Sequence, residues 1–243
     1  MVSPRRYQQG ISLYIIIVIV MLSMLLALWA SRTSLFNELI VGNDADYQRA
    51  FEAAQAVIQD AELDIRGERP DGSDCVPVMA NALANPPVVA QPNICRTGTT
   101  VWFIDEEKDL GSLLSTLEDQ ATRCLQGICQ KRTGNQDFWN DSTTLTAMIA
   151  NGVAARYGQY TGAQTGPNSN PILNNVTAGQ GAWYWVEIMP YDTNPGGLLA
   201  GKPKLDLNLK PPVVFRITAI ARGLKPSTQV VLQSTFARQK MKN

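Results

Sequence analysis

The side chains that could do chemistry in this chain are limited first by an absence, since none of its 243 residues is histidine. Ser-His-Asp and Cys-His nucleophilic sites, and metal sites built on imidazole, are therefore excluded. Carboxylates remain as candidate acids or calcium ligands, and they gather in the segment 105–109 and in the pair Asp71 and Asp74. Neither group has the spacing of an EF-hand loop, so solvated turns are the favoured interpretation. The segment 105–109 can also place negative charge at the start of a following helix.

The cysteines are the other reactive groups: Cys75, Cys95, Cys124 and Cys129. In an exported chain, an even count favours two disulfides over metal ligation. The Cys124-x4-Cys129 spacing is not that of a zinc knuckle, and no histidine can complete one. The sequence alone permits three ways of pairing the four cysteines. We favour Cys75 with Cys95 and Cys124 with Cys129, because each pair closes a local loop and would make the middle of the chain rigid.

The charges balance, with 21 Lys and Arg against 21 Asp and Glu. This balance gives no reason to expect nucleic acid as the main partner. We expect no catalytic residue, no cofactor and no bound metal, and therefore a protein that is not an enzyme. The elements that position the cysteines and carboxylates then carry the functional information.

An uncharged run, Ile11–Ala30, follows a leader that contains Arg5 and Arg6. At about 1.5 Å per residue, a helix of this length spans about 30 Å, the hydrocarbon thickness of a bilayer. The basic leader favours a cytoplasmic N-terminus and an exported remainder. A cleaved signal peptide is the alternative, but its apolar run is usually shorter and ends in small residues, whereas this run ends in Leu28-Trp29-Ala30.

Apolar residues continue beyond the span at helical spacing, which predicts an amphipathic helix. They are Leu35, Leu39, Tyr47, Phe51, Ala54, Ile58, Ala61 and Ile65. No proline lies between Pro4 and Pro70, so span and amphipathic stretch can form one helix of about 55 residues. Gly42 is its weak point, and Gly67 and Pro70 end it.

The remainder predicts an α+β domain. Strands are expected at 100–104, 183–189, 213–221 and 228–237, the last two as a hairpin, and helices at 113–126 and 143–157. The sheet should pack on the amphipathic stripe and bury Phe51 and Ile58. Core packing is favoured over ligand binding for Trp183-Tyr184-Trp185, because at least one face of that strand should be buried. The polar tract 158–175 is the favoured loop for contact with a partner.

Three stretches resemble one family. Gly10 followed by Ile11-Ser12-Leu13 is similar to a prepilin processing site, the segment 50–62 resembles the matching part of PilX-type minor pilins, and so does the tail formed by 215–223 and 230–236. The resemblance covers both ends of the chain and leaves residues 70–182 unmatched. It implies a pilin-like α+β fold in which a long N-terminal helix packs on an antiparallel sheet with an inserted helical and loop region.

The resemblance also implies how the chain is processed and where it is located. Prepilin peptidase would cut after Gly10 and methylate the new amine of Ile11. Three parts follow: a leader at 1–10, a long helix at 11–66 with its span at 11–30, and a periplasmic head at 67–243. The protein would be held in the inner membrane by a single span until it enters an extracellular pilus.

Most pilins have glutamate at the position of Ile15, where it is taken to pair with the N-terminal amine of the subunit added before. A carboxylate in lipid is costly, and Ile15 neither bears this cost nor gains the pairing. The hypothesis is that this subunit has no earlier neighbour and lies at the tip or in the priming complex. Alternatively, apolar packing of Ile15, Ile16 and Ile17 suffices at any position in the fibre.

The resemblance therefore implies a minor pilin that primes type IV pilus assembly. Its expected partners are other minor pilins, the major pilin, prepilin peptidase and the inner membrane, with a tip adhesin as a further candidate. Two alternatives stand beside it: a minor pseudopilin of type II secretion, and a periplasmic binding domain on a permanent anchor. Cleavage at Gly10 separates the pilin class from the anchored domain.

Overall fold

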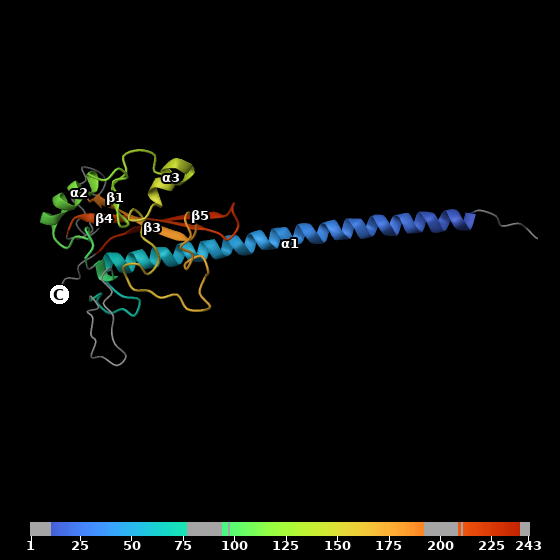
Figure 1. Ribbon diagram of the computed structural model, residues 1–243, viewed down its shortest axis with the longest axis horizontal. Helices are drawn as coiled ribbons and strands as arrows, with labels where there is room; N and C mark the ends of the chain where they lie inside the picture. The colour runs from blue at the N-terminus through green and yellow to red at the C-terminus, as the bar shows by residue number, and fades with distance from the viewer. Residues whose placement is uncertain (1–10, 77–93, 97, 192–208, 210, 239–243) are drawn as a thin grey trace, which may run out of the picture. The chain divides into compact units, whose positions relative to one another are not determined.

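A computed structural model gives the structure of the protein and describes residues 11–76, 94–96, 98–191, 209 and 211–238. The chain divides into two compact units, residues 1–45 and residues 46–243. We call the second unit the head. Helix α1 (Ile11–Arg66) supplies residues to both units and continues past Gly42 without a break (Figure 1).

In the first unit, large apolar side chains lie exposed around the helix from Leu13 to Val41. The most apolar window of α1 has a mean hydropathy of 2.8, and none of that window is buried. Within the described part of the chain, α1 is the one helix long and apolar enough to cross a membrane. Such a surface needs lipid or other apolar helices around it.

Helix α1 ends as its sequence predicts. Gly67 has a φ of 69°, the left-handed conformation that glycine adopts without a side-chain clash. Its N–H donates to the Asp64 carbonyl at 3.2 Å, and the Glu68 N–H donates to the Leu63 carbonyl at 3.0 Å. These two bonds form a Schellman motif and satisfy the last carbonyls of the helix.

The head contains a five-stranded sheet in the order β1-β2-β3-β4-β5. The strands are β1 (Cys124–Leu125), β2 (Ile128–Gln130), β3 (Ala182–Pro190), β4 (Val213–Arg222) and β5 (Gln229–Phe236). The β2–β3 pair is parallel and the other pairs are antiparallel. Strand β3 is rich in aromatic and β-branched residues, as its central position requires. The α+β fold and the C-terminal hairpin are confirmed, but the sheet is mixed and not wholly antiparallel as expected, because β2 runs parallel to β3.

Three expected elements are wrong in detail. Residues 100–104 form no strand: their backbone pairs with no strand, while Val101, Phe103 and Ile104 are nonetheless buried. The two helices are shorter than expected, α2 at Leu110–Glu118 and α3 at Ser142–Met148. The helix expected at 113–126 stops early because residues 124–130 turn back at Gly127 (φ 80°) to form the β1–β2 hairpin.

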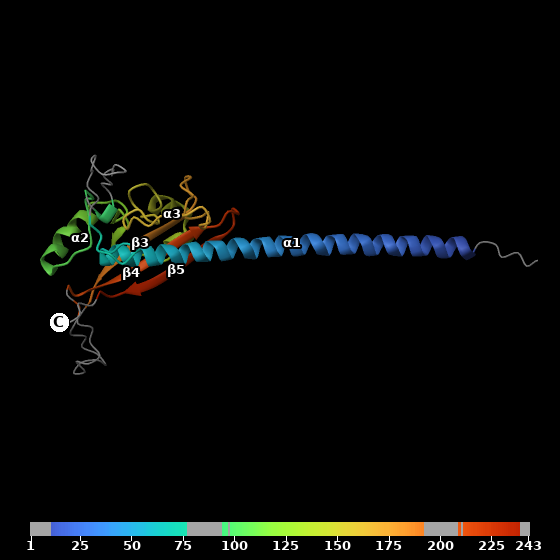
Figure 2. The ribbon, with the colours of Figure 1, turned by 90° about the horizontal axis from the view of Figure 1, so that it is seen from below.

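The head part of α1 lies along one face of the sheet, as the two ribbon views agree (Figures 1 and 2). The buried apolar side chains of this helix face are mostly alanine: Ala50, Ala53, Ala54, Val57, Ala61 and Ile65. Phe51 and Ile58, expected beneath the sheet, are only partly buried at the margin of the core. Small side chains let the helix approach the strands closely, so the bulky residues are displaced to the edge.

The opposite face of the sheet carries a second core. Trp183 and Trp185 pack there with Phe138, Leu145 and Met148, while Tyr184 points to the α1 face. The three aromatic residues are each at most 1% exposed. Both faces of β3 are therefore covered. The run Trp183-Tyr184-Trp185 belongs to the core, as the sequence analysis favours.

Candidate functional site

The residues of the expected processing site lie at the start of α1. Gly10 is outside the described residues, and Ile11 is the first residue of the helix. Ile15 lies in the part of α1 that belongs to the first unit, and it is 49% exposed. The residues that follow it on the helix, Ile16 to Val20, are also apolar and exposed.

The four cysteines form two disulfides, Cys75–Cys95 and Cys124–Cys129, which are the pairs that the loop lengths favour. The first joins the chain just after α1 to the short turn η1 (Ile94–Arg96). The second closes the β1–β2 hairpin and lies in the core on the far side of the sheet from α1. Each disulfide therefore fixes one edge of the head.

The sequence-predicted acidic groups lie at turns. Asp71 accepts hydrogen bonds from the backbone N–H and the hydroxyl of Ser73, at 2.9 and 2.6 Å. Asp105 pairs with Arg238, and residues 107–109 precede α2. Within the described ranges, no group of three or more Cys, Asp or Glu side chains is placed to hold a metal ion.

Three other carboxylates on α1 are the unexpected feature of the head. Asp46, Asp60 and Asp64 are each 6% exposed or less, on the helix face that packs against the sheet. A buried carboxylate is costly unless it is paired or hydrogen-bonded. Each of the three meets a different segment of the head, so the acids act as anchors between α1 and the remainder of the fold.

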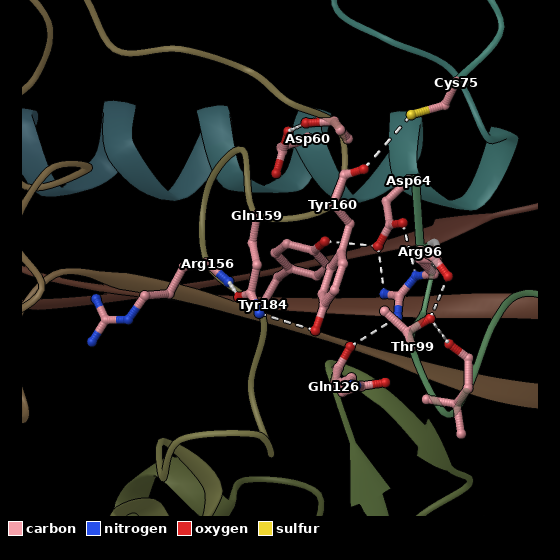
Figure 3. A network of polar contacts seen from close by, with 12 residues as sticks. Asp60, Asp64, Cys75, Arg96, Thr99, Gln126, Arg156, Gln159, Tyr160 and Tyr184 are labelled. Atoms are coloured by element: carbon pink, nitrogen blue, oxygen red, sulfur yellow. Dashed lines mark hydrogen bonds and ion pairs between the residues drawn. The ribbon is translucent and has the colours of Figure 1, made fainter. Parts of the chain in front are cut away.

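Asp64 is the most elaborate of these anchors (Figure 3). The Arg96 guanidinium donates from Nε to Oδ1 at 2.8 Å and from Nη2 to Oδ2 at 2.5 Å. The Tyr184 hydroxyl donates to Oδ2 at 2.7 Å. Arg96 also donates from Nη1 to the Gln126 carbonyl at 3.1 Å. The helix, η1, β3 and the β1–β2 turn thus meet at one buried carboxylate.

Aromatic rings enclose the Arg96 guanidinium, whose carbon lies 4.0 Å from the Tyr160 ring centroid and 4.8 Å from that of Phe103. Burial alone would lower the pKa of Arg96, but the charge and hydrogen bonds of Asp64 raise it above the usual value. Burial and the nearby carboxylates raise the pKa of Tyr184 well above 10, so this tyrosine remains a neutral donor. The group is a buried ion pair, with 6% and 3% of the two side chains exposed.

The backbone that presents Arg96 is unusual. Cys95 and Arg96 have φ values of 62° and 51°, a left-handed conformation that costs non-glycine residues free energy. The Cys95 N–H donates to the Tyr160 carbonyl at 2.7 Å, and the Cys75–Cys95 disulfide holds the same residue. The disulfide and the ion pair together therefore retain a turn that neither residue favours alone.

Asp60 anchors the polar tract 158–175. It accepts hydrogen bonds from the Gly158 N–H at 2.8 Å and from the Thr161 hydroxyl. The same tract reaches α1 again where the Asn170 amide donates to the Arg49 carbonyl at 2.6 Å. The polar tract, favoured for contact with a partner, is thus bonded to α1 at two places. The exposed residues 164 and 166–168 lie between these two contacts.

Burial raises the pKa of Asp60 to about 6, against the hydrogen bonds from Thr161 and Gly158 and with the help of the nearby Asp64 charge. A raised native pKa stabilises the fold at acid pH, fully below about pH 4, and this contribution is lost as the pH rises through 6.

Asp60→Asn should remove this pH dependence. In the natural protein, protonation of Asp60 should add about 2 kcal/mol to the free energy of unfolding between pH 7 and pH 4.5. The measurement is urea unfolding of the full chain in detergent at several pH values. Asp141→Asn is the control, because its capping bond to Thr144 lowers the pKa of Asp141 and places its effect below this range. Equal pH profiles for the natural chain and Asp60→Asn would contradict the assignment.

Asp46 is the anchor nearest the first unit. Its carboxylate accepts hydrogen bonds from the backbone N–H groups of Leu224 and Lys225, at 2.8 and 3.1 Å, in the β4–β5 turn. Burial opposes ionisation, but these bonds and one with Thr228 lower the pKa of Asp46 overall. Gly223 makes room for the Asp46 carboxylate, because a Cβ atom at position 223 would clash with it.

Sequence reasoning missed these three anchors, although a signal was present. Asp46, Asp60 and Asp64 interrupt the apolar stripe of α1 on its own buried face, where a charge needs a partner. Arg96 could not be found in this way, because it lies in an irregular turn with no periodic pattern.

Comparison with known proteins completes the description. No curated protein and no solved structure gives a significant match to the chain. A family model does match: residues 125–238 fit the family described as type IV pilus assembly protein PilX C-term. The match runs from β1 to the residues after β5 and includes 125–182, a region that the sequence resemblance left unmatched. Over this C-terminal region, the chain is similar to the PilX family of type IV pilus assembly proteins.

Proposed function

We propose that the protein is a minor pilin that helps to prime type IV pilus assembly and lies at or near the pilus tip. The observation that carries the proposal is the combination, in one chain, of a PilX C-terminal region and an exposed apolar helix that precedes it. The fold offers a structural role for every buried polar group in the α1 interface. We therefore propose a structural protein rather than an enzyme.

The apolar part of α1 supplies the two environments that such a subunit needs. In the inner membrane, before assembly, lipid would cover the exposed side chains between Leu13 and Val41. In the fibre, the helices of other minor pilins and of the major pilin would cover the same surface, with the head outside. A tip adhesin is a further candidate partner for the head.

The N-terminus of the mature protein tests this proposal. Intact-mass and N-terminal peptide mass spectrometry of protein purified from cell membranes should show a chain that begins at Ile11 and carries one methyl group on its amine. A Gly10→Leu variant should retain the leader and fail to enter pili. A natural chain that begins at Ser31 or beyond would indicate a cleaved signal peptide, and an uncut chain would indicate a permanent anchor.

A tip or priming position makes Ile15→Glu informative. We expect this variant to give the same number of pili per cell or fewer, because the new carboxylate costs up to about 3 kcal/mol in lipid and gains no amine partner. Ile15→Leu, which keeps the position apolar, should leave pilus number unchanged. Pili would be counted by electron microscopy, with immunogold labelling of the head. Labelled natural subunits along the whole shaft would instead support apolar packing at any position in the fibre.

A further inference from the structure

The sheet face opposite α1 carries a cleft of about 410 Å³. Its floor is formed by Trp185 and Glu187 of β3 and Thr218 of β4. The β1–β2 hairpin with its disulfide forms one wall, and α3 with the preceding turn forms the other. This volume lies in the range that holds small ligands or a few side chains.

One cation in this cleft lacks a matching acid. The Arg132 guanidinium lies 3.3 Å from the Met148 sulfur and 4.9 Å from the Phe138 ring centroid, and both of those residues line the cleft. Among the described residues, no carboxylate forms an ion pair with Arg132. The contrast is with Arg96, an arginine of the same head that is held by two hydrogen bonds to one carboxylate.

The acid nearest to Arg132 is already occupied. Glu187 accepts from Arg216 Nε at 2.6 Å and from the backbone N–H of Arg132 at 2.9 Å, which leaves its charge neutralised by Arg216. Arg123, on the rim of the cleft, has only a 3.9 Å contact to exposed Glu118. Two basic side chains, Arg123 and Arg132, therefore line the cleft, and neither is held closely by a carboxylate in the described part of the chain.

These features select a ligand chemistry. A half-buried guanidinium without a carboxylate partner favours a carboxylate ligand, which it can bind through two hydrogen bonds. Phe138 and Met148 contact the guanidinium but are themselves buried, so the charge of Arg132, and not an apolar surface, selects the ligand. An acidic residue of a peptide segment supplies such a carboxylate.

We propose that this cleft binds an acidic peptide segment of another pilus protein, with the carboxylate of that segment on Arg132. The choice of a pilus protein as the source rests on the proposed function. The site lies on the sheet face opposite α1, so it would join subunits through their heads, independently of the apolar helix.

The test uses the full chain in detergent micelles and two pools of blocked hexapeptides, each with random flanks around a central Leu-Asp or Leu-Asn. Binding is followed by tryptophan fluorescence, since Trp185 lines the cleft. The Leu-Asp pool should bind at least tenfold more tightly than the Leu-Asn pool. Arg132→Gln should remove this difference, whereas Lys131→Gln, at the exposed neighbouring position, should preserve it.

Three outcomes would overturn the proposal: equal affinities for the two pools, no saturable binding of either pool, or a preference for Leu-Asp that survives Arg132→Gln. A parallel titration with isovalerate distinguishes the source of the carboxylate. If isovalerate binds as tightly as the Leu-Asp pool, the cleft is a site for small carboxylates and not for peptides. Failure here, with the N-terminus processed at Gly10, would reject the cleft proposal and leave the proposed function standing.

Discussion

Arg96→Met should lower the free energy of unfolding of the head by about 3–5 kcal/mol, the cost of leaving one member of a buried ion pair without its partner. Methionine fills much of the volume between Tyr160 and Phe103 but cannot donate to Asp64. Urea unfolding of the full chain in detergent, followed by near-ultraviolet circular dichroism, measures the loss.

The control is Arg123→Met, which removes an exposed arginine with a long contact to Glu118 and should change stability by less than about 1 kcal/mol. Adding Asp64→Leu to Arg96→Met should restore part of the lost stability, because the unpaired buried charge is then gone. A loss from Arg96→Met no larger than that from Arg123→Met would show that Asp64 is solvated and that the ion pair is not an anchor.

The second large effect is expected when Cys75 and Cys95 are both changed to serine. A disulfide that closes a loop of this length, with a sequence separation of 20, contributes about 3 kcal/mol. It also holds the left-handed turn that presents Arg96 to Asp64, so the loss should exceed the disulfide contribution alone. The same unfolding assay, with thiol titration to confirm the change, measures it.

The two effects should not add. In a chain that already carries Arg96→Met, removing the disulfide should cost less than in the natural chain, because the ion pair that depends on the turn is already lost. In the Arg123→Met background, the cost of removing the disulfide should be unchanged. Full additivity with Arg96→Met would mean that the disulfide acts on the unfolded chain alone and does not position the arginine.

The helices and strands with a clear hydrophobic periodicity could be predicted from the sequence. The apolar run 11–30 and the stripe that follows it have no proline, and α1 forms as one helix. The β4–β5 hairpin follows from alternation on both sides of a turn that contains glycine and proline. In these cases local preference and the final packing agree, so the pattern alone was sufficient.

Elements that depend on distant contacts could not be predicted. Residues 100–104 have the composition of a strand, yet they are buried without strand pairing, with Phe103 edge-to-face against Phe215 at 5.7 Å. Burial produces the same apolar signal with or without a ladder partner. The helix predicted at 113–126 likewise yields to the β1–β2 hairpin, whose disulfide and parallel pairing with β3 are tertiary features.

The candidate site divides in the same way. Gly10 and Ile11 follow from a local motif, and the cysteine pairs follow from short loops. The Asp64–Arg96–Tyr184 group brings together residues 32 and 120 positions from Asp64, and no local pattern encodes such a meeting. The predicted stripe also gave too much weight to large side chains: Phe51 was expected in the core, but alanines occupy it.

Asp46 is the first buried residue described on α1. Its hydrogen bonds to Leu224 and Lys225 mark the start of the buried part of the helix. A soluble version of the protein would therefore have to begin no later than this aspartate, because a later start would remove the hydrogen bonds between Asp46 and the β4–β5 turn. The large apolar residues between Leu13 and Val41 are exposed. Their identity can therefore change with the thickness of the host membrane or with the neighbouring subunits, while the internal packing of the head is kept.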